Sequence, residues 1–115
     1  MMHDSPKRAV RCVRLATEDA PALSSLESRC FALPWTEQAF AEAFAGKTFH
    51  AFGIRETASP LSPRELAGYI AVYHTPDEVE ILNIAVREDR RRHGYGRLLM
   101  ATALQDAKET GILQG

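Results

Sequence analysis

The chain lacks most of what a secreted, membrane or metal-binding protein would carry. It has only two cysteines, Cys12 and Cys30, and their spacing fits neither a disulfide framework nor a metal site. Residues 1–11 contain no apolar stretch of the signal-peptide kind, and no apolar run approaches the roughly 18 residues that span a bilayer. We therefore expect a cytoplasmic protein with reduced thiols, no metal and no membrane partner.

Strong charge of either sign is also missing. The formal net charge is -1, whereas a general nucleic-acid binder is usually strongly basic. Arginines gather locally instead, at Arg87, Arg90–Arg92 and Arg97. This cluster could form a solvated face or contact RNA, but Glu88 and Asp89 interrupt it and no aromatic stacking platform accompanies it. We expect no direct nucleic-acid partner.

The hydrophobic pattern predicts a single α/β domain of order β-α-α-β-β-β-α, with helices on both faces of a sheet. Strands are expected over 10–15, 50–55, 65–74 and 79–86, and helices over about 17–30, 36–44 and 94–110. Thr17 and Thr36 are the predicted N-caps of the first two helices. The buried face of the last helix is predicted from the spacing of Met100, Ala103, Leu104 and Ala107. Residues 1–9 are expected to be disordered.

A glycine-containing loop follows the last predicted strand. The apolar run 81–86 leads into Arg91-Arg92-His93-Gly94-Tyr95-Gly96, where the last helix begins. A helix start presents unpaired backbone N–H groups and a positive dipole end to nearby anions. Glycines let the backbone approach a pyrophosphate closely, and arginines add charge-assisted hydrogen bonds. The segment is a candidate phosphate-binding loop, with a plain tight turn as the alternative.

Two common nucleotide-binding motifs are not present here. A dinucleotide fold requires G-x-G-x-x-G, and Leu99 occupies the position of the third glycine. The Gly-Lys-Ser/Thr ending of a P-loop is missing as well. The segment instead matches Arg/Gln-x-x-Gly-x-Gly/Ala after a strand. It resembles the acetyl-CoA-binding motif of the Gcn5-related N-acetyltransferases (GNAT).

Two further segments resemble one branch of that superfamily, the ribosomal-protein-alanine N-acetyltransferases or RimI family. Asn83-Ile84-Ala85-Val86 is similar to the strand that precedes the family's loop, and 30–40 is similar to its Phe-x-x-Pro-Trp-Ser/Thr-Glu segment. The resemblance covers roughly residues 10–113. It implies a GNAT fold for residues 10–115, incomplete at the C-terminus.

The resemblance also implies roles for individual residues, with acetyl-CoA as co-substrate. The pantetheine arm would lie against Ile84, Ala85 and Val86, where backbone N–H groups would stabilise the oxyanion. The pyrophosphate would be held by Arg91, Arg92, His93, Gly94, Tyr95, Gly96 and Arg97. The acceptor would contact Phe31, Trp35 and Asn83, although a lone tryptophan can equally be a core residue. Glu80 is a candidate general base, or merely part of a solvated strand entrance.

The family continues, after the glycine-motif helix, with a strand bearing a glutamate base, then an asparagine and a tyrosine acid. No residue of this chain matches those three. We expect the C-terminal strands to be missing, through truncation, completion by a second fragment, or degeneration. The activity implied is acetyl transfer to the N-terminal alanine of a ribosomal protein. A catalytically inactive acyl-CoA-binding or interaction fragment and a small-molecule amine acetyltransferase are the alternatives.

Overall fold

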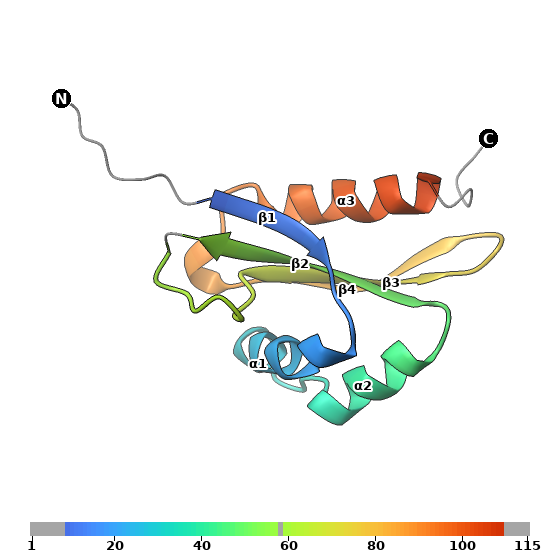
Figure 1. Ribbon diagram of the computed structural model, residues 1–115, viewed down its shortest axis with the longest axis horizontal. Helices are drawn as coiled ribbons and strands as arrows, with labels where there is room; N and C mark the ends of the chain where they lie inside the picture. The colour runs from blue at the N-terminus through green and yellow to red at the C-terminus, as the bar shows by residue number, and fades with distance from the viewer. Residues whose placement is uncertain (1–8, 58, 110–115) are drawn as a thin grey trace.

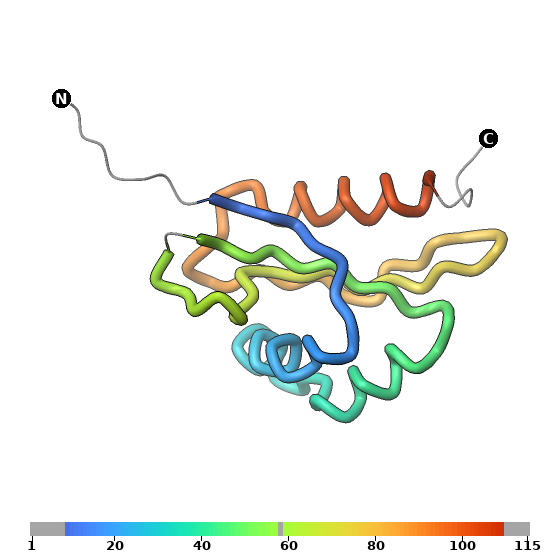
Figure 2. The backbone as a smooth tube through the Cα atoms, viewed as in Figure 1, coloured from blue at the N-terminus to red at the C-terminus, as the bar shows by residue number. Residues whose placement is uncertain are grey.

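The structure is a computed structural model, and it describes residues 9–57 and 59–109. Four antiparallel strands form one sheet in the order β1-β2-β3-β4. Helices α1 and α2 cover one face and α3 covers the other (Figures 1 and 2). In chain order the elements are β1 (Ala9–Arg14), η1 (Thr17–Asp19), α1 (Ala20–Cys30), α2 (Glu37–Ala45), β2 (Phe49–Thr57), β3 (Gly68–His74), β4 (Val79–Val86), η2 (Glu88–Arg90) and α3 (Tyr95–Glu109).

The predicted element order and the helices on both faces are confirmed. Of residues 1–9, which are expected to be disordered, Ala9 belongs to β1, because it pairs with Thr57 in the sheet, and residues 1–8 lie outside the described part of the chain. The predicted end of the last helix, beyond Glu109, also lies outside the described residues.

Two hydrophobic clusters lie on opposite sides of the sheet, and β3 contributes to both. Tyr69 and Ala71 face α1 and α2, while Ile70 and Val72 face α3. All four side chains are buried, as expected for an interior strand covered on both faces. β1 and β4 form the edges of the four described strands.

β4 contains a bulge, which changes the face on which its residues lie. Asn83 pairs with Ala71 and Ile81 pairs with Val72, so Leu82 has no partner residue of its own. An extra residue of this kind bends the strand and increases its twist. The bulge lies just before Asn83–Val86, the segment expected to contact acetyl-CoA.

The start of α1 differs from the prediction, because Thr17 is not its cap. Residues 17–19 form a separate turn of 3-10 helix, and Ala16 precedes it. The Asp19 carboxylate accepts the Ala16 N–H at 2.8 Å, which closes this turn from its C-terminal side. This contact is one half of a capping box on the 3-10 turn, whereas α1 itself starts after Asp19 without a side-chain capping hydrogen bond.

β3 begins at Gly68 and not at residue 65, because Glu65 closes a turn. Its carboxylate accepts the Ser62 N–H at 2.8 Å, and its own N–H donates to the Ser62 carbonyl at 3.1 Å. α3 likewise begins at Tyr95, one residue after Gly94, which has φ 80°.

The buried face of α3 was predicted only in part. Tyr95, Leu99, Ala103 and Ala107 are buried, whereas Leu104 is 43% exposed and Met100 only half-buried. The helix therefore meets the sheet along one narrow row of residues four apart, in which small alanines allow close approach. Among the described helices, none combines the length and apolar character that a membrane span requires.

Removing the cap of α2 should destabilise the protein by about 1 kcal/mol. The Thr36 hydroxyl accepts the Ala39 N–H at 3.0 Å, and Thr36→Ala leaves that donor without its partner. Urea unfolding should show a lower midpoint with an unchanged slope. Thr48→Ala, at an exposed threonine outside the helices, is the matched control. Equal effects of the two substitutions would contradict the cap.

Candidate functional site

A groove of about 360 Å³ runs beside the C-terminal end of β4. Many of the residues predicted from the resemblance meet here: it is lined by Cys30, Phe31, Ile84, Ala85, Val86, Arg91 and Gly96. The Cys30 thiol donates to the Val86 carbonyl at 3.7 Å, and burial raises its pKa. Cys30 is therefore a wall of the groove and not a nucleophile.

The predicted phosphate loop lies at one end of this groove and curls tightly. Arg92 has φ 69° and Gly94 φ 80°, both in the left-handed region. A Cβ added to Gly94 or Gly96 would meet no other heavy atom within 4 Å. The protein therefore leaves open space beside the first turn of α3, where backbone N–H groups lack intrahelical partners. Such a helix start can bind a phosphate group.

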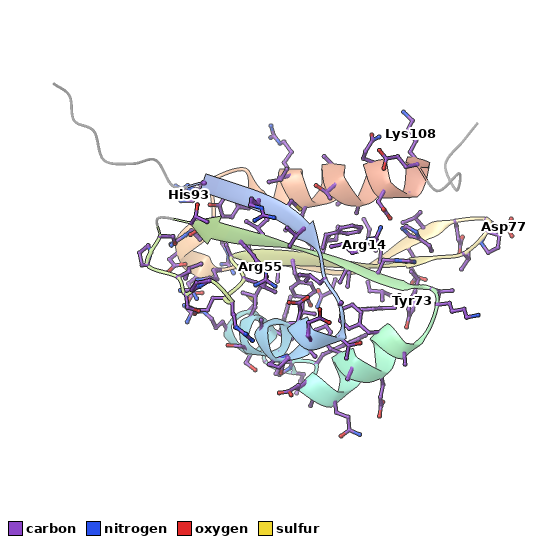
Figure 3. The ribbon with its side chains drawn as sticks, in the orientation of Figure 1. Arg14, Arg55, Tyr73, Asp77, His93 and Lys108 are labelled. Atoms are coloured by element: carbon purple, nitrogen blue, oxygen red, sulfur yellow. The ribbon has the colours of Figure 1, made fainter. Side chains whose placement is uncertain are left out.

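Of the charged side chains of the loop, that of Arg91 holds the loop in place and the others are exposed to solvent. The Arg91 Nε donates to the Val86 carbonyl at 3.2 Å, which ties the loop back to β4. Arg92, His93 and Arg97 are exposed, and the His93 ring lies 5.8 Å from the Tyr95 ring. Figure 3 shows His93 at one end of the molecule and Asp77, in the turn between β3 and β4, at the opposite end.

Tyr95 differs from the other loop residues, because it is buried and points inward. Its hydroxyl donates to Glu56 Oε2 at 2.5 Å. The same carboxylate accepts two hydrogen bonds from Arg90 Nε, at 2.8 and 3.1 Å, and one from Ser59 at 2.6 Å. Tyr95 is predicted to contact the cofactor, and its hydroxyl makes a supporting contact beneath the loop.

The environment of Glu56 strongly favours the ionised carboxylate. Burial on its own would raise the pKa, but the hydrogen bonds from Arg90, Ser59 and Tyr95 outweigh it and lower the pKa to about 2. The Glu56 side chain is 0% exposed and that of Arg90 is 8% exposed. This buried pair fixes both η2 and the start of α3 against β2.

A second buried carboxylate, Glu27 in α1, lies on the other face of the sheet. It accepts a hydrogen bond from the Tyr69 hydroxyl, one from the Trp35 N–H at 3.3 Å, and the Asn83 amide at 3.2 Å. Burial and the contact with Glu27 raise the pKa of Tyr69. Asn83, predicted to contact the acceptor, thus uses its amide to hold α1 against β4.

The predicted acceptor-side residues are not brought into one place. Phe31 lies in the groove, but Trp35 packs against Phe40 and Phe49, with ring centroids 5.2 and 6.2 Å away. Trp35 is half-buried and also lines a shallow hollow beside Pro34 and Tyr73. Trp35 therefore contributes both to the hydrophobic core and to the surface of the protein.

The candidate general base, Glu80, does not line the groove: it is exposed and pairs with Tyr73 across the ladder. The Ile84 N–H, one of the expected oxyanion donors, donates to the side-chain Oδ1 of the preceding residue, Asn83, at 3.1 Å. The described residues contain no cluster of three His, Cys, Asp or Glu side chains that could hold a metal ion.

Sequence reasoning missed both buried carboxylates. Glu56 is the penultimate residue of a strand and Glu27 is one acid in a polar helix, so neither stands out by spacing. Glu27 lies 42 and 56 residues from its partners Tyr69 and Asn83, and Glu56 lies 34 and 39 residues from Arg90 and Tyr95, so these contacts can be recognised only once the sheet is formed.

Comparison with known proteins identifies the class to which this fold and groove belong. Residues 20–114 match the Acetyltransferase (GNAT) family, so the chain belongs to that family. Its sheet, with helices on both faces and a glycine loop after β4, is the GNAT arrangement.

Within the family, the chain is similar to ribosomal-protein-alanine N-acetyltransferases. It is 30% identical over 98 residues to the [ribosomal protein bS18]-alanine N-acetyltransferase of Escherichia coli K12, covering 85% of this chain and 62% of that protein. It is 29% identical over 103 residues to a putative enzyme of the same name from Bacillus subtilis 168, covering 90% and 64%. The chain thus spans less than two thirds of these relatives.

Solved structures agree with the fold. The crystal structure of the Escherichia coli ribosomal-protein-S18-alanine N-acetyltransferase superposes with a TM-score of 0.75 at 28% identity, covering 90% of this chain and 63% of that one. An aminoglycoside N-acetyltransferase in complex with CoA has the same TM-score at 12% identity, which shows the fold alone.

The Glu56 carboxylate should make stability depend on pH in acid. Its pKa is about 2 in the folded protein and near 4.5 when unperturbed, so its contribution is complete above about pH 4.5 and is lost as the pH falls towards 2. The shift corresponds to roughly 3 kcal/mol. Urea unfolding at a series of pH values from 7 to 2 should show that the difference in free energy of unfolding between wild type and Glu56→Gln decreases across this window.

Asp89→Asn is the control for that experiment. The pKa of Asp89 is also lowered to about 2, chiefly by hydrogen bonds from Arg87, but its side chain is 48% exposed, so solvent screens the interaction. A gap for Glu56→Gln that does not change with pH, or an equal effect of Asp89→Asn, would contradict the buried pair.

Proposed function

We propose that the protein transfers the acetyl group of acetyl-CoA to an amine, and that the amine is the N-terminal alanine of a ribosomal protein. The observation that carries this proposal is the open space at Gly96, at the end of the groove formed by β4 and the C-terminal part of α1. The family relationship supports acetyl-CoA, and the similarity to bS18-alanine acetyltransferases supports the acceptor. A ribosomal acceptor would place the reaction in the cytoplasm.

Acetyl-CoA would lie along β4. The pantetheine arm would follow Ile84, Ala85 and Val86, and the pyrophosphate would meet the first-turn N–H groups of α3, assisted by the exposed Arg92 and Arg97. Glu56 and Arg90 would act as positioning residues, since they hold both ends of the loop. A preformed loop avoids the entropy of ordering the backbone on binding.

Acetyl transfer to an α-amino group requires mainly that the protein position the amine beside the thioester. An α-amino group has a pKa of about 7.7–8.0, so a sizeable fraction is neutral and nucleophilic at physiological pH. Holding the thioester beside this amine makes the attack effectively unimolecular. Phe31, which lines the groove and is 36% exposed, would contact the acceptor chain.

The activity is tested with an alanine-initiated peptide and acetyl-CoA, and peptide acetylation is followed by mass spectrometry. The same peptide with a blocked N-terminus is the control for the site of transfer. Acetylation of a polyamine or an aminoglycoside in preference to the peptide would favour the small-molecule alternative. Binding of CoA without any transfer would favour a non-catalytic acyl-CoA-binding fragment.

Gly96→Val should abolish CoA binding without unfolding the protein. A Cβ added at Gly96 meets no side chain and no backbone outside its own helix and neighbours within 4 Å, so a side chain there would extend into the space proposed for the ligand. Calorimetry should show loss of CoA binding, while the unfolding midpoint stays close to that of the wild type, because valine is no worse than glycine in a helix. Ala101→Val, at an exposed position further along α3, is the control for a valine on the surface of this helix. Unchanged CoA affinity in Gly96→Val would rule out the proposed phosphate site.

A further inference from the structure

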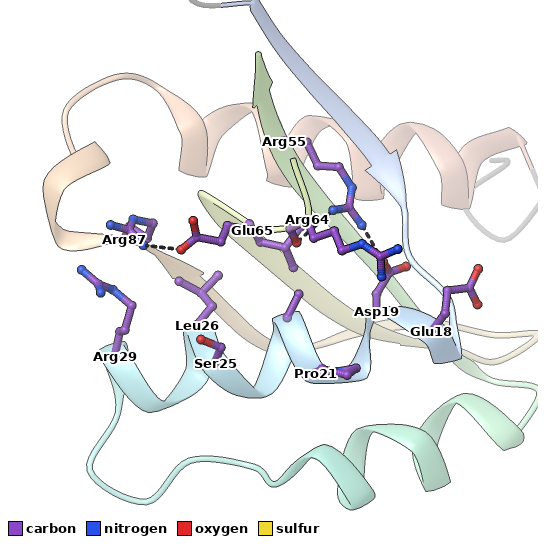
Figure 4. A pocket seen from close by; sticks show the side chains of 12 residues that line it. Glu18, Asp19, Pro21, Ser25, Leu26, Arg29, Arg55, Arg64, Glu65 and Arg87 are labelled. Atoms are coloured by element: carbon purple, nitrogen blue, oxygen red, sulfur yellow. Dashed lines mark hydrogen bonds and ion pairs between the residues drawn. The ribbon is translucent and has the colours of Figure 1, made fainter. Parts of the chain in front are cut away.

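A second cavity, of about 500 Å³, lies between α1 and the segment that joins β2 to β3 (Figure 4). It shares no lining residue with the acetyl-CoA groove. Its volume falls in the range of small-molecule sites in proteins, which is about 300–1,000 Å³. The proposed acetyl transfer does not use this cavity.

The floor of the cavity is apolar. It is formed by Pro21, Ala22 and Leu26 from α1 and by Leu66 from the segment before β3. Leu26 and Leu66 are each only 3% exposed, so the surrounding structure holds both firmly. A floor of this kind suits a small ring or a short hydrocarbon chain.

The rim of the cavity is rich in arginine, and one arginine is uncommitted. Arg55 is paired with Asp19 at 2.5 Å, and Arg87 lies 3.7 Å from Glu65. The side chain of Arg64 makes no hydrogen bond or ion pair with any described residue, and Figure 4 shows it next to Arg55 at the cavity. A guanidinium offers a planar fork of donors that matches a carboxylate.

We propose that this cavity binds a small organic monocarboxylate, with its apolar body on Leu26 and Leu66 and its carboxylate at Arg64. The acids of the same rim limit how much negative charge the site accepts, because Glu18 and Glu65 would repel a doubly charged phosphate. A single carboxylate on an apolar body satisfies both the floor and the rim.

The rim also connects this cavity to the phosphate loop. Arg29 donates to Glu88 at 2.9 Å, and Arg87 donates to Asp89 at 3.0 Å. Both acids belong to η2, which leads into the loop. In Figure 4 these two arginines lie at the end of the cavity away from the Arg64 side chain, so their ion pairs with η2 are kept when a carboxylate binds at Arg64.

The test is a titration of the 115-residue protein with benzoate, followed by the backbone amide signals in two-dimensional NMR, with no acetyl-CoA present. The amides of Ala22, Leu26 and Leu66 should shift to saturation with a single dissociation constant. Benzamide, of the same shape but uncharged, should bind at least about tenfold more weakly, since it cannot form the charge-assisted pair.

Two matched pairs of variants locate the site. Arg64→Ala should weaken benzoate binding about tenfold, whereas Lys47→Ala, which removes an exposed cation elsewhere, should leave it unchanged. Ser25→Phe, from the helix surface that lines the cavity, should block binding, whereas Ser28→Phe on the same helix should not. Equal shifts with benzamide, or full binding by Ser25→Phe or Arg64→Ala, would overturn the site.

Discussion

The buried ion pair between Glu56 and Arg90 is the interaction on which the candidate cofactor site depends. Removing a carboxylate and a guanidinium from water costs several kcal/mol each, and only good geometry with further hydrogen bonds offsets that cost. Here the further donors are Ser59 and Tyr95, so the carboxylate is satisfied only when three segments meet at β2. The loop before α3 is therefore held at both of its ends, while the exposed residues between them are left for a ligand.

Glu27 has a comparable role on the opposite face of the sheet. It links α1 to β3 through Tyr69, to β4 through Asn83, and to the segment before α2 through the Trp35 N–H. Unlike Glu56, it has no cation within salt-bridge distance among the described residues, and hydrogen-bond donors alone satisfy it. The groove thus has one wall anchored through Glu27, and the glycine loop at its end is anchored through Glu56, although neither acid lines the groove.

The secondary-structure elements that depend on local sequence pattern could be predicted from the sequence. The features that depend on contacts between distant residues could not. Alternating and helical spacing located the four strands and three α-helices of the described residues, but not the 3-10 helices η1 and η2, and the glycine loop was placed correctly after β4. Thr17 was preferred as a cap because threonine favours that position, yet residues 17–19 form their own turn, which the Asp19 carboxylate closes on the Ala16 N–H, and α1 begins only at Ala20. Leu104 was predicted to be buried, but Leu99 and the alanines already fill the contact between α3 and the sheet. The partners of Glu56 and Glu27 could not be predicted, since no local spacing connects them.

The bulge at Leu82 shows most clearly how one long-range feature redirects the site. Simple alternation would place Ile81 and Asn83 on the same face of β4. The observed register pairs Ile81 with Val72, which faces α3, and Asn83 with Ala71, which faces α1. The extra residue thereby turns the Asn83 amide towards Glu27 and directs Ile84 and Val86 to the opposite side. Because the backbone of the same segment forms the wall of the groove, the bulge couples the buried Glu27 cluster directly to the surface along which acetyl-CoA is proposed to bind.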